Sequence, residues 1–98
     1  MSDWTWEYIP DSAHVVGGLT PGQCAEVEAL AQRIADAVAV RMIGRPFNPE
    51  EAVSGLKSYG EGMVTLWYQE DYRDDTVVIC RVQHLGPDAG PVGFQNGA

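Results

Sequence analysis

The side chains that could carry chemistry gather in the second half of this chain. A strand predicted at 63–69 separates an extended segment at 55–60 from a second strand at 76–84. If the first strand lies between the other two segments in one sheet, their polar side chains approach one sheet face or its rim. Lys and Arg side chains stabilise a developing phosphate charge, and His or Tyr side chains move protons. The group comprises Lys57, Tyr59, Arg73, Arg81 and His84. It would suit metal-independent cleavage of RNA. The alternative is scattered surface charge with one histidine at a strand end.

A second group of ionisable side chains forms the run EDYRDD at 70–75, which we expect to be solubilising charge in a turn. A metal site built from its four carboxylates, Glu70, Asp71, Asp74 and Asp75, stays open as an alternative. The run does not match an EF-hand loop, which needs Gly and Glu at fixed positions. We therefore expect neither a metal nor a small-molecule cofactor.

The two cysteines, Cys24 and Cys80, lie in apolar-patterned segments and are expected to be buried thiols. No CxxC pair or closely spaced histidines accompany them, so zinc is not expected. The chain also lacks Walker, Rossmann, zincin and nucleophile-elbow signatures.

Length and charge limit the classes of function. The chain has 98 residues, enough for one domain with a modest core, and a formal net charge of −8. Such a charge disfavours nucleic-acid binding through a broad basic surface. No apolar run approaches the roughly 20 residues that span a bilayer, and the N-terminus has no secretory signal pattern. We expect a cytoplasmic protein without membrane association.

The first half of the chain predicts a strand and a long helix. Residues 4–9, WTWEYI, have the aromatic content of a strand, and residues 11–19 predict a short helix capped by Asp11 or Ser12. Thr20, followed by proline and Gln23, matches a capping box. Apolar residues at helical spacing then continue to a stop at Gly44.

The second half predicts a connection and three extended segments. In the connection at 45–54, Phe47 and Val53 are expected to contact the core. Leu56 is expected to point inward and Lys57 away from the protein. On the strand at 63–69, one face holds Val64, Leu66 and Tyr68. On the strand at 76–84, the expected core-facing set is Val78, Cys80, Val82 and His84.

These elements predict an α+β fold. We expect a small twisted antiparallel sheet of about four strands, with one long and one or two short helices packed on one face. Residues 1–86 would form the single domain. Residues 87–98, rich in Gly and Pro, would form a flexible tail.

The order of elements and the segment Thr76–Leu85, TVVICRVQHL, resemble the RelE/ParE superfamily of bacterial toxins. In that family an "LxG"-like segment precedes a strand ending in Tyr, an acidic hairpin turn follows, and the next strand reads like "VVILRVxHR". The matching residues are Leu56-Lys57, Tyr68, Asp74-Asp75 and the run 77–84. The resemblance covers roughly residues 4–85. It implies a toxin-like fold neutralised by an antitoxin, and activity as a messenger-RNA interferase on the ribosome or as a gyrase poison. It also implies Lys57, Arg81 and His84 as catalytic residues.

Two hypotheses for the function follow. The first is a toxin of a toxin–antitoxin system, a metal-independent endoribonuclease acting on translation with ribosome and messenger RNA as targets. The second is a non-catalytic acidic module of the same fold that binds another protein. Thr65 stands where the family has an arginine, and Leu85 replaces a basic residue after His84. These differences and the acidic charge favour the second hypothesis.

Overall fold

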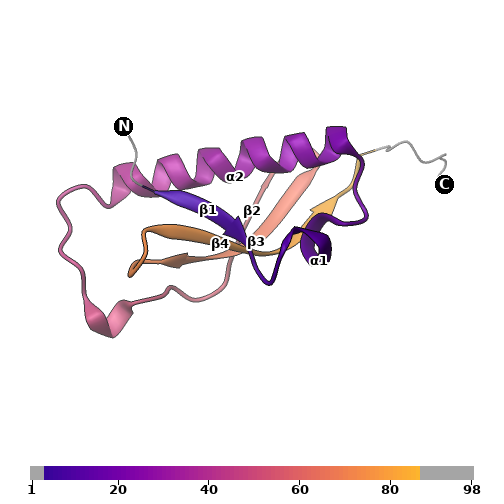
Figure 1. Cartoon of the computed structure of the whole chain (residues 1–98). Helices are drawn as coiled ribbons and strands as arrows, with labels where there is room; N and C mark the ends of the chain where they lie inside the picture. The colour runs from indigo at the N-terminus through magenta and orange to yellow at the C-terminus, as the bar shows by residue number, and fades with distance from the viewer. Residues whose placement is uncertain (1–3, 87–98) are drawn as a thin grey trace.

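A four-stranded mixed sheet with the strand order β1-β4-β3-β2 forms the frame of the protein (Figure 1). The structure is a computed structural model that describes residues 4–86. The strands are β1 (Thr5–Tyr8), β2 (Lys57–Glu61), β3 (Val64–Asp71) and β4 (Thr76–His84), and the helices are α1 (Ser12–Val16), α2 (Pro21–Arg41) and a 3₁₀ turn, η1 (Pro49–Glu51). The predicted α+β class, with one long and one short helix against a four-stranded sheet, is confirmed. The tail predicted at 87–98 lies outside the described residues.

One strand pairing differs from the predicted antiparallel sheet, because β1 runs parallel to β4. The pairings of β3 with β2 and with β4 are antiparallel, as expected for strands joined by tight turns. The period-two pattern of residues 4–9 indicates a strand but contains no information about its direction. The two helices carry the chain away from β1, so no hairpin fixes its orientation.

Helix α2 begins and ends as the sequence predicts. The Oγ1 atom of Thr20 accepts a hydrogen bond of 3.1 Å from the Gln23 amide, and the Thr20 amide donates one of 2.9 Å to Oε1 of Gln23. This reciprocal pair satisfies two amides that the first helical turn leaves without partners. Beyond the last turn, Gly44 has a φ of 78°, a left-handed conformation that glycine adopts without strain.

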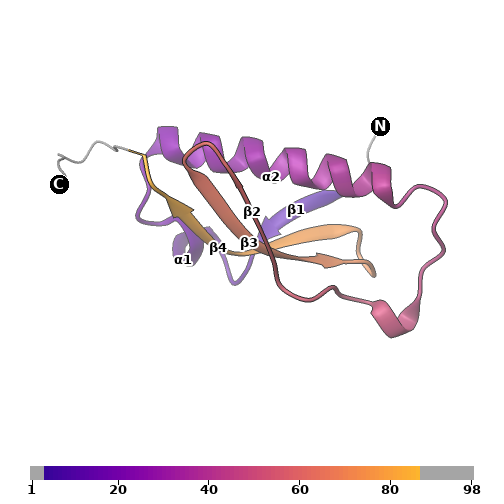
Figure 2. The ribbon, with the colours of Figure 1, turned by 180° about the vertical axis from the view of Figure 1, so that it is seen from behind.

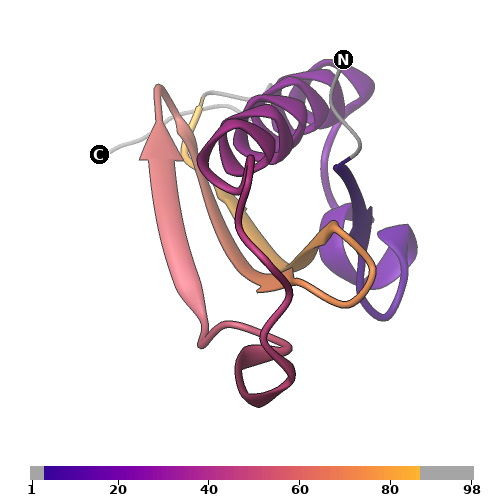
Figure 3. The ribbon, with the colours of Figure 1, turned by 90° about the vertical axis from the view of Figure 1, so that its left-hand side faces the viewer.

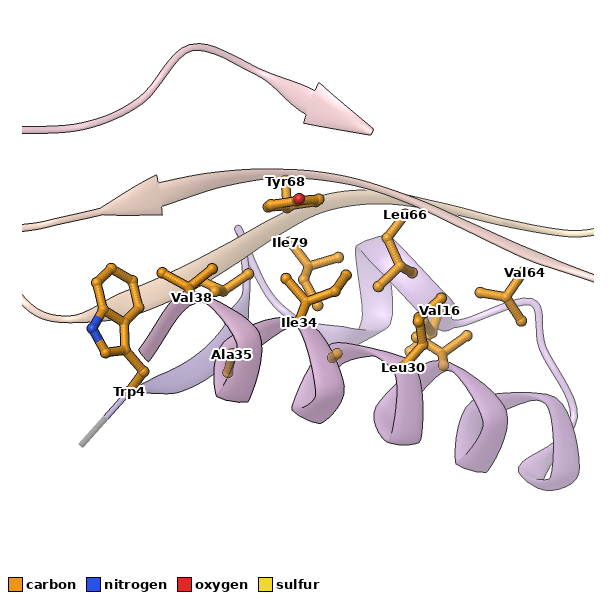
Figure 4. Packing of buried hydrophobic residues seen from close by; sticks show 13 residues of the cluster. Trp4, Val16, Leu30, Ile34, Ala35, Val38, Val64, Leu66, Tyr68 and Ile79 are labelled. Atoms are coloured by element: carbon orange, nitrogen blue, oxygen red, sulfur yellow. The ribbon is translucent and has the colours of Figure 1, made fainter. Parts of the chain in front are cut away.

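The core lies between α2 and the concave face of the sheet, which bends around the helix (Figure 3). Leu30, Ile34 and Val38 of the helix meet Leu66 of β3 and Ile79 of β4 (Figure 4). Val64 and Tyr68 lie on the same face of β3, as the sequence predicts. α2 packs mainly against β1, β3 and β4, so β2 at the sheet edge has little cover from the helix.

A β-bulge in β4 corrects the predicted core face of that strand. The pairing of β3 with β4 shifts between Trp67 and Tyr68, because Tyr68 lies opposite Ile79 while Trp67 lies opposite Arg81. Cys80 is the extra residue, and such a residue reverses the facing of all residues beyond it. Before the bulge, Val77 and Ile79 belong to the core cluster in place of the predicted Val78, although Val78 is also buried, at 8% exposed. Beyond it, Val82 and His84 face the helix as predicted, whereas Cys80 is exposed and was wrongly placed in the core. Cys24 is partly buried against the core, and both thiols are free.

The connection from α2 to β2 makes fewer core contacts than the sequence predicts. It swings out beyond the end of α2 and returns to β2 (Figure 2). Phe47, Val53 and Leu56 are 52%, 38% and 63% exposed, so the prediction that they point inward is wrong. The backbone of Val53 nevertheless joins the sheet through an isolated antiparallel bridge to Asp71 of β3. The predicted helical turn is present, with the Asn48 side chain accepting a bond from the Glu50 amide.

Candidate functional site

The structure does not bring the predicted catalytic residues Lys57, Arg81 and His84 together. β3 does lie between β2 and β4, as the prediction required. Lys57 pairs with Tyr68, however, and His84 pairs with Val64, four residues away along β3. Four residues of strand span roughly 13 Å. Arg81 pairs with Trp67, whose side chain lies on the sheet face opposite Tyr68. The three side chains therefore cannot act together on one phosphate group.

His84 joins the end of β4 to the first turns of α2. Its side chain is 4% exposed, and Nε2 lies 2.8 Å from Oε1 of Glu26. The amide of Gly86 donates a 2.9 Å hydrogen bond to Nδ1. A neutral ring that accepts at Nδ1 carries its proton at Nε2 and donates it to the carboxylate. Both ring nitrogens thus have partners within the fold, which leaves neither available as a general base.

Lys57 belongs to a cluster centred on the carboxylate of Glu70, the Glu70 cluster. The Glu70 side chain is 1% exposed, although the sequence predicted solubilising charge at this position. Oε1 accepts hydrogen bonds from Arg41 and, at 2.7 Å, from the Tyr72 hydroxyl. Nζ of Lys57 lies 3.6 Å from Oε2, so this side chain points toward the protein. The prediction that Lys57 points away from the protein is therefore wrong. Three elements and a turn meet at this one carboxylate.

The Glu70 cluster holds its carboxylate ionised. Burial alone would raise the pKa of Glu70, but hydrogen bonds from Tyr72 and Arg41, with the charges of Arg41 and Lys57, lower it below its usual value. The same contact acts in reverse on the phenol. Burial, together with the bond to Glu70, raises the pKa of Tyr72 to about 12. Glu70 is therefore suited to holding α2, β2 and the β3–β4 turn together, and not to proton transfer.

Of the remaining candidates, the two arginines also have partners within the fold. The guanidinium of Arg81 stacks on the ring of Trp67, 4.9 Å from its centroid. Arg73 makes a two-pronged contact with Asp71, with both N···O distances 3.1 Å, which lowers the pKa of that carboxyl. Tyr59 is 47% exposed at the sheet edge. No group of three or more His, Cys, Asp or Glu side chains within residues 4–86 is placed to hold a metal ion.

A recess lies at the C-terminal end of α2. It lies between the last turns of the helix, the connection to β2 and the β3–β4 turn; we call it the α2-end recess. Several of its apolar side chains are large and exposed, among them Ile43 at 77%, Val40 at 69% and Phe47 at 52%. Its other apolar side chains are Trp4, Ala39, Met42, Pro46 and Val53. Its ionisable side chains are Asp36, Arg41, Arg45, Glu51, Lys57, Tyr72 and Asp75.

Sequence reasoning missed both the recess and the burial of Glu70. The period-two pattern of β3 contains the signal for Glu70, because residue 70 continues the face of Val64, Leu66 and Tyr68. Nothing in the pattern marks the recess. Two of its side chains, Phe47 and Val53, were expected to contact the core, and no prediction was made for Val40 and Ile43.

Comparisons with protein-family models, with curated proteins and with solved structures found no match to this chain. Within residues 4–86, the fold and the site define a small α+β protein with a recess at the end of α2 that is lined by both apolar and polar side chains. The resemblance to the RelE/ParE superfamily stays a hypothesis that rests on the quoted residues. No helix within residues 4–86 is long and apolar enough to cross a bilayer.

Proposed function

We propose that this chain is a non-catalytic, cytoplasmic protein-binding module whose partner docks in the α2-end recess. The observation that carries the proposal is the clustering of Val40, Ile43 and Phe47, all more than half exposed, around one concavity. Single exposed apolar residues are ordinary, but a group of them around a recess is typical of a binding site. Phenylalanine is among the residue types enriched at the cores of protein interfaces, so Phe47 is the expected anchor.

The charges around the recess favour a cationic partner. Two of its three basic side chains, Arg41 and Lys57, already contact the carboxylate of Glu70. Arg45 is then the one further base in the recess lining of the described chain, against three exposed carboxylates. Those are Asp36, Glu51 and Asp75. With a net charge of −8 on the whole chain, the surrounding field attracts positive charge. The expected partner presents apolar anchors flanked by Lys or Arg.

The toxin hypothesis has less support. Metal-independent cleavage of RNA needs a base, an acid and a cation at one phosphate. Lys57, Arg81 and His84 lie apart, and each already has a partner in the fold. A ribosome-directed protein also benefits from positive charge, which this chain lacks. Growth arrest on induced expression in bacteria, relieved by Lys57→Ala or His84→Ala in a variant that still folds, would restore the toxin hypothesis.

Peptide selection tests the binding proposal directly. Random peptides displayed on phage are selected on the wild-type protein and counter-selected on the double variant Ile43→Ser, Phe47→Ser. The enriched peptides are expected to combine Lys or Arg with large apolar residues, and to bind the double variant at least about tenfold more weakly. The matched control is Met63→Ser, Leu85→Ser, which changes two equally exposed apolar residues away from the recess. Peptides that bind both double variants alike would contradict the proposal.

A further inference from the structure

We infer that β2 pairs antiparallel with β2 of a second copy of this chain, joining the two sheets into one. β2 is an edge strand whose only described partner is β3. Residues 58–61 are exposed. The free edge of such a strand presents unpaired amides and carbonyls, which a strand of another chain can satisfy. This inference does not depend on the proposed function, because it rests on the edge of β2, of which only Lys57 also lines the recess.

The sequence of β2, KSYGE, is complementary to itself. In an antiparallel pair with a two-fold axis at Tyr59, Lys57 lies opposite Glu61 of the second copy. Ser58 then lies opposite Gly60, and the two Tyr59 residues face each other. Opposite charges and aromatic pairs directly across a strand pair are stabilising, and like charges are destabilising. Two-fold symmetry produces both Lys–Glu contacts at once, so β2 matches a second copy of itself.

An apolar groove beside β2 supplies further area to bury. It lies between α2 and β2, and its apolar and aromatic lining includes Leu30, Ile34 and Val38 of the helix and Tyr59 and Tyr68 of the sheet. Four charged side chains, Arg33, Arg41, Glu61 and Glu70, complete this lining. Figure 3 shows β2 at the edge of the sheet, to one side of α2. In the paired arrangement the grooves of the two copies adjoin across the axis, with both Tyr59 rings between them. Strand pairing and groove closure would together remove apolar area from water.

The usual protection of a sheet edge against pairing with another chain is weak in β2. Natural edges are often blunted by a lysine that points into solvent. Lys57 is the one lysine of the chain, and its ammonium lies 3.6 Å from Glu70 of the same copy. It lies at the end of β2, where the proposed pairing gives it a carboxylate partner. The charge of Lys57 therefore favours pairing with a strand that places a carboxylate opposite it.

Site-specific crosslinking tests the register. In a Cys80→Ala background, Tyr59→Cys brings two thiols together at the axis, since opposite Cβ atoms of an antiparallel pair lie about 4.5–5.5 Å apart. Mild oxidation is expected to give a covalent dimer at least about tenfold faster than for Met63→Cys, an equally exposed position off the axis. Equal rates for the two variants, or no crosslink for either, would overturn the inference.

Sedimentation of charge variants tests the pairing without a crosslink. The wild type is expected to sediment as a reversible dimer. Glu61→Lys places two ammonium groups opposite the Lys57 residues and is expected to weaken the dimer about tenfold. Glu61 also pairs with Arg33 at 2.8 Å, so Arg33→Ala is the matched control; it removes that contact but leaves the strand edge intact. A monomeric wild type, or equal weakening by the two variants, would refute the pairing.

Discussion

Nε2 of His84 lies 2.8 Å from Oε1 of Glu26, across 58 positions of sequence. This contact fastens the end of β4 to the beginning of α2, at the end of the molecule opposite the α2-end recess. A chemically similar pair, His14 with Asp11, lies on the surface at 2.9 Å, with side chains 70% and 55% exposed. The two histidines therefore give a matched comparison of a buried and an exposed contact.

His84→Ala is expected to lower the free energy of unfolding by about 1–3 kcal/mol, because it leaves the Gly86 amide without its acceptor and opens a space beside α2. His14→Ala should change it by less than about 0.5 kcal/mol, as exposed contacts do. Urea unfolding followed by circular dichroism measures both. Equal effects of the two substitutions would show that His84 is not a structural contact.

Glu70→Gln is expected to cost about 1–3 kcal/mol, since it removes the charge that Arg41 and Lys57 share in a nearly fully buried position. Tyr72→Phe should cost about 1 kcal/mol by removing one donor to the same oxygen. Thermal and urea unfolding report both values. The exposed Glu28→Gln is the control, and a similar loss there would mean that the Glu70 cluster has no special role.

Much of the fold follows from local patterns in the sequence. The capping box at Thr20 and the alternation of Val64, Leu66 and Tyr68 identify α2 and β3, because caps and periodicity act within a few residues. The bulge at Cys80 and the direction of β1 depend on contacts between distant segments, so local patterns do not reveal them. The candidate site of Lys57, Arg81 and His84 was predicted from residue types. Residue types alone do not show which charged side chains pair with each other in the folded protein. Glu70 illustrates this, since it reads as turn charge but lies beneath Arg41.

Stability should fall on both sides of a plateau in pH. The pKa values of Glu70 and Asp71 are lowered in the folded protein from ordinary values of 4.5 and 3.8. Their stabilisation is therefore complete above about pH 5 and is lost as the pH falls further. The pKa of Tyr72 is raised from 10.0 to about 12, so its contribution is complete below pH 10 and is lost as the pH rises toward 12. The free energy of unfolding measured against pH tests both limits. Glu70→Gln should flatten the acid side, and an unchanged acid slope would contradict the assignment.

The bulge at Cys80 predicts that the two thiols react at different rates. Cys80 is exposed, whereas Cys24 is partly buried and its Sγ lies 3.9 Å from the carbonyl oxygen of Val16. A thiol-specific chromogenic disulfide should modify one thiol of the native protein quickly and the other much more slowly. Cys80→Ser should remove the fast phase and Cys24→Ser the slow one. Two equal rates in the folded protein would mean that Cys80 does not form the bulge.

Binding at the α2-end recess is the central claim, and a titration followed by amide resonances of the ¹⁵N-labelled protein tests it most directly. The probe is an amphipathic peptide of Leu and Lys; its control is the same peptide with every Lys replaced by Glu. The Lys peptide is expected to shift resonances of the recess, around Val40, Ile43, Phe47 and Asp75, and the double variant Ile43→Ser, Phe47→Ser is expected to lose these shifts. Shifts spread over the whole surface, equal binding of the Glu peptide, or no shifts in the recess would contradict the claim.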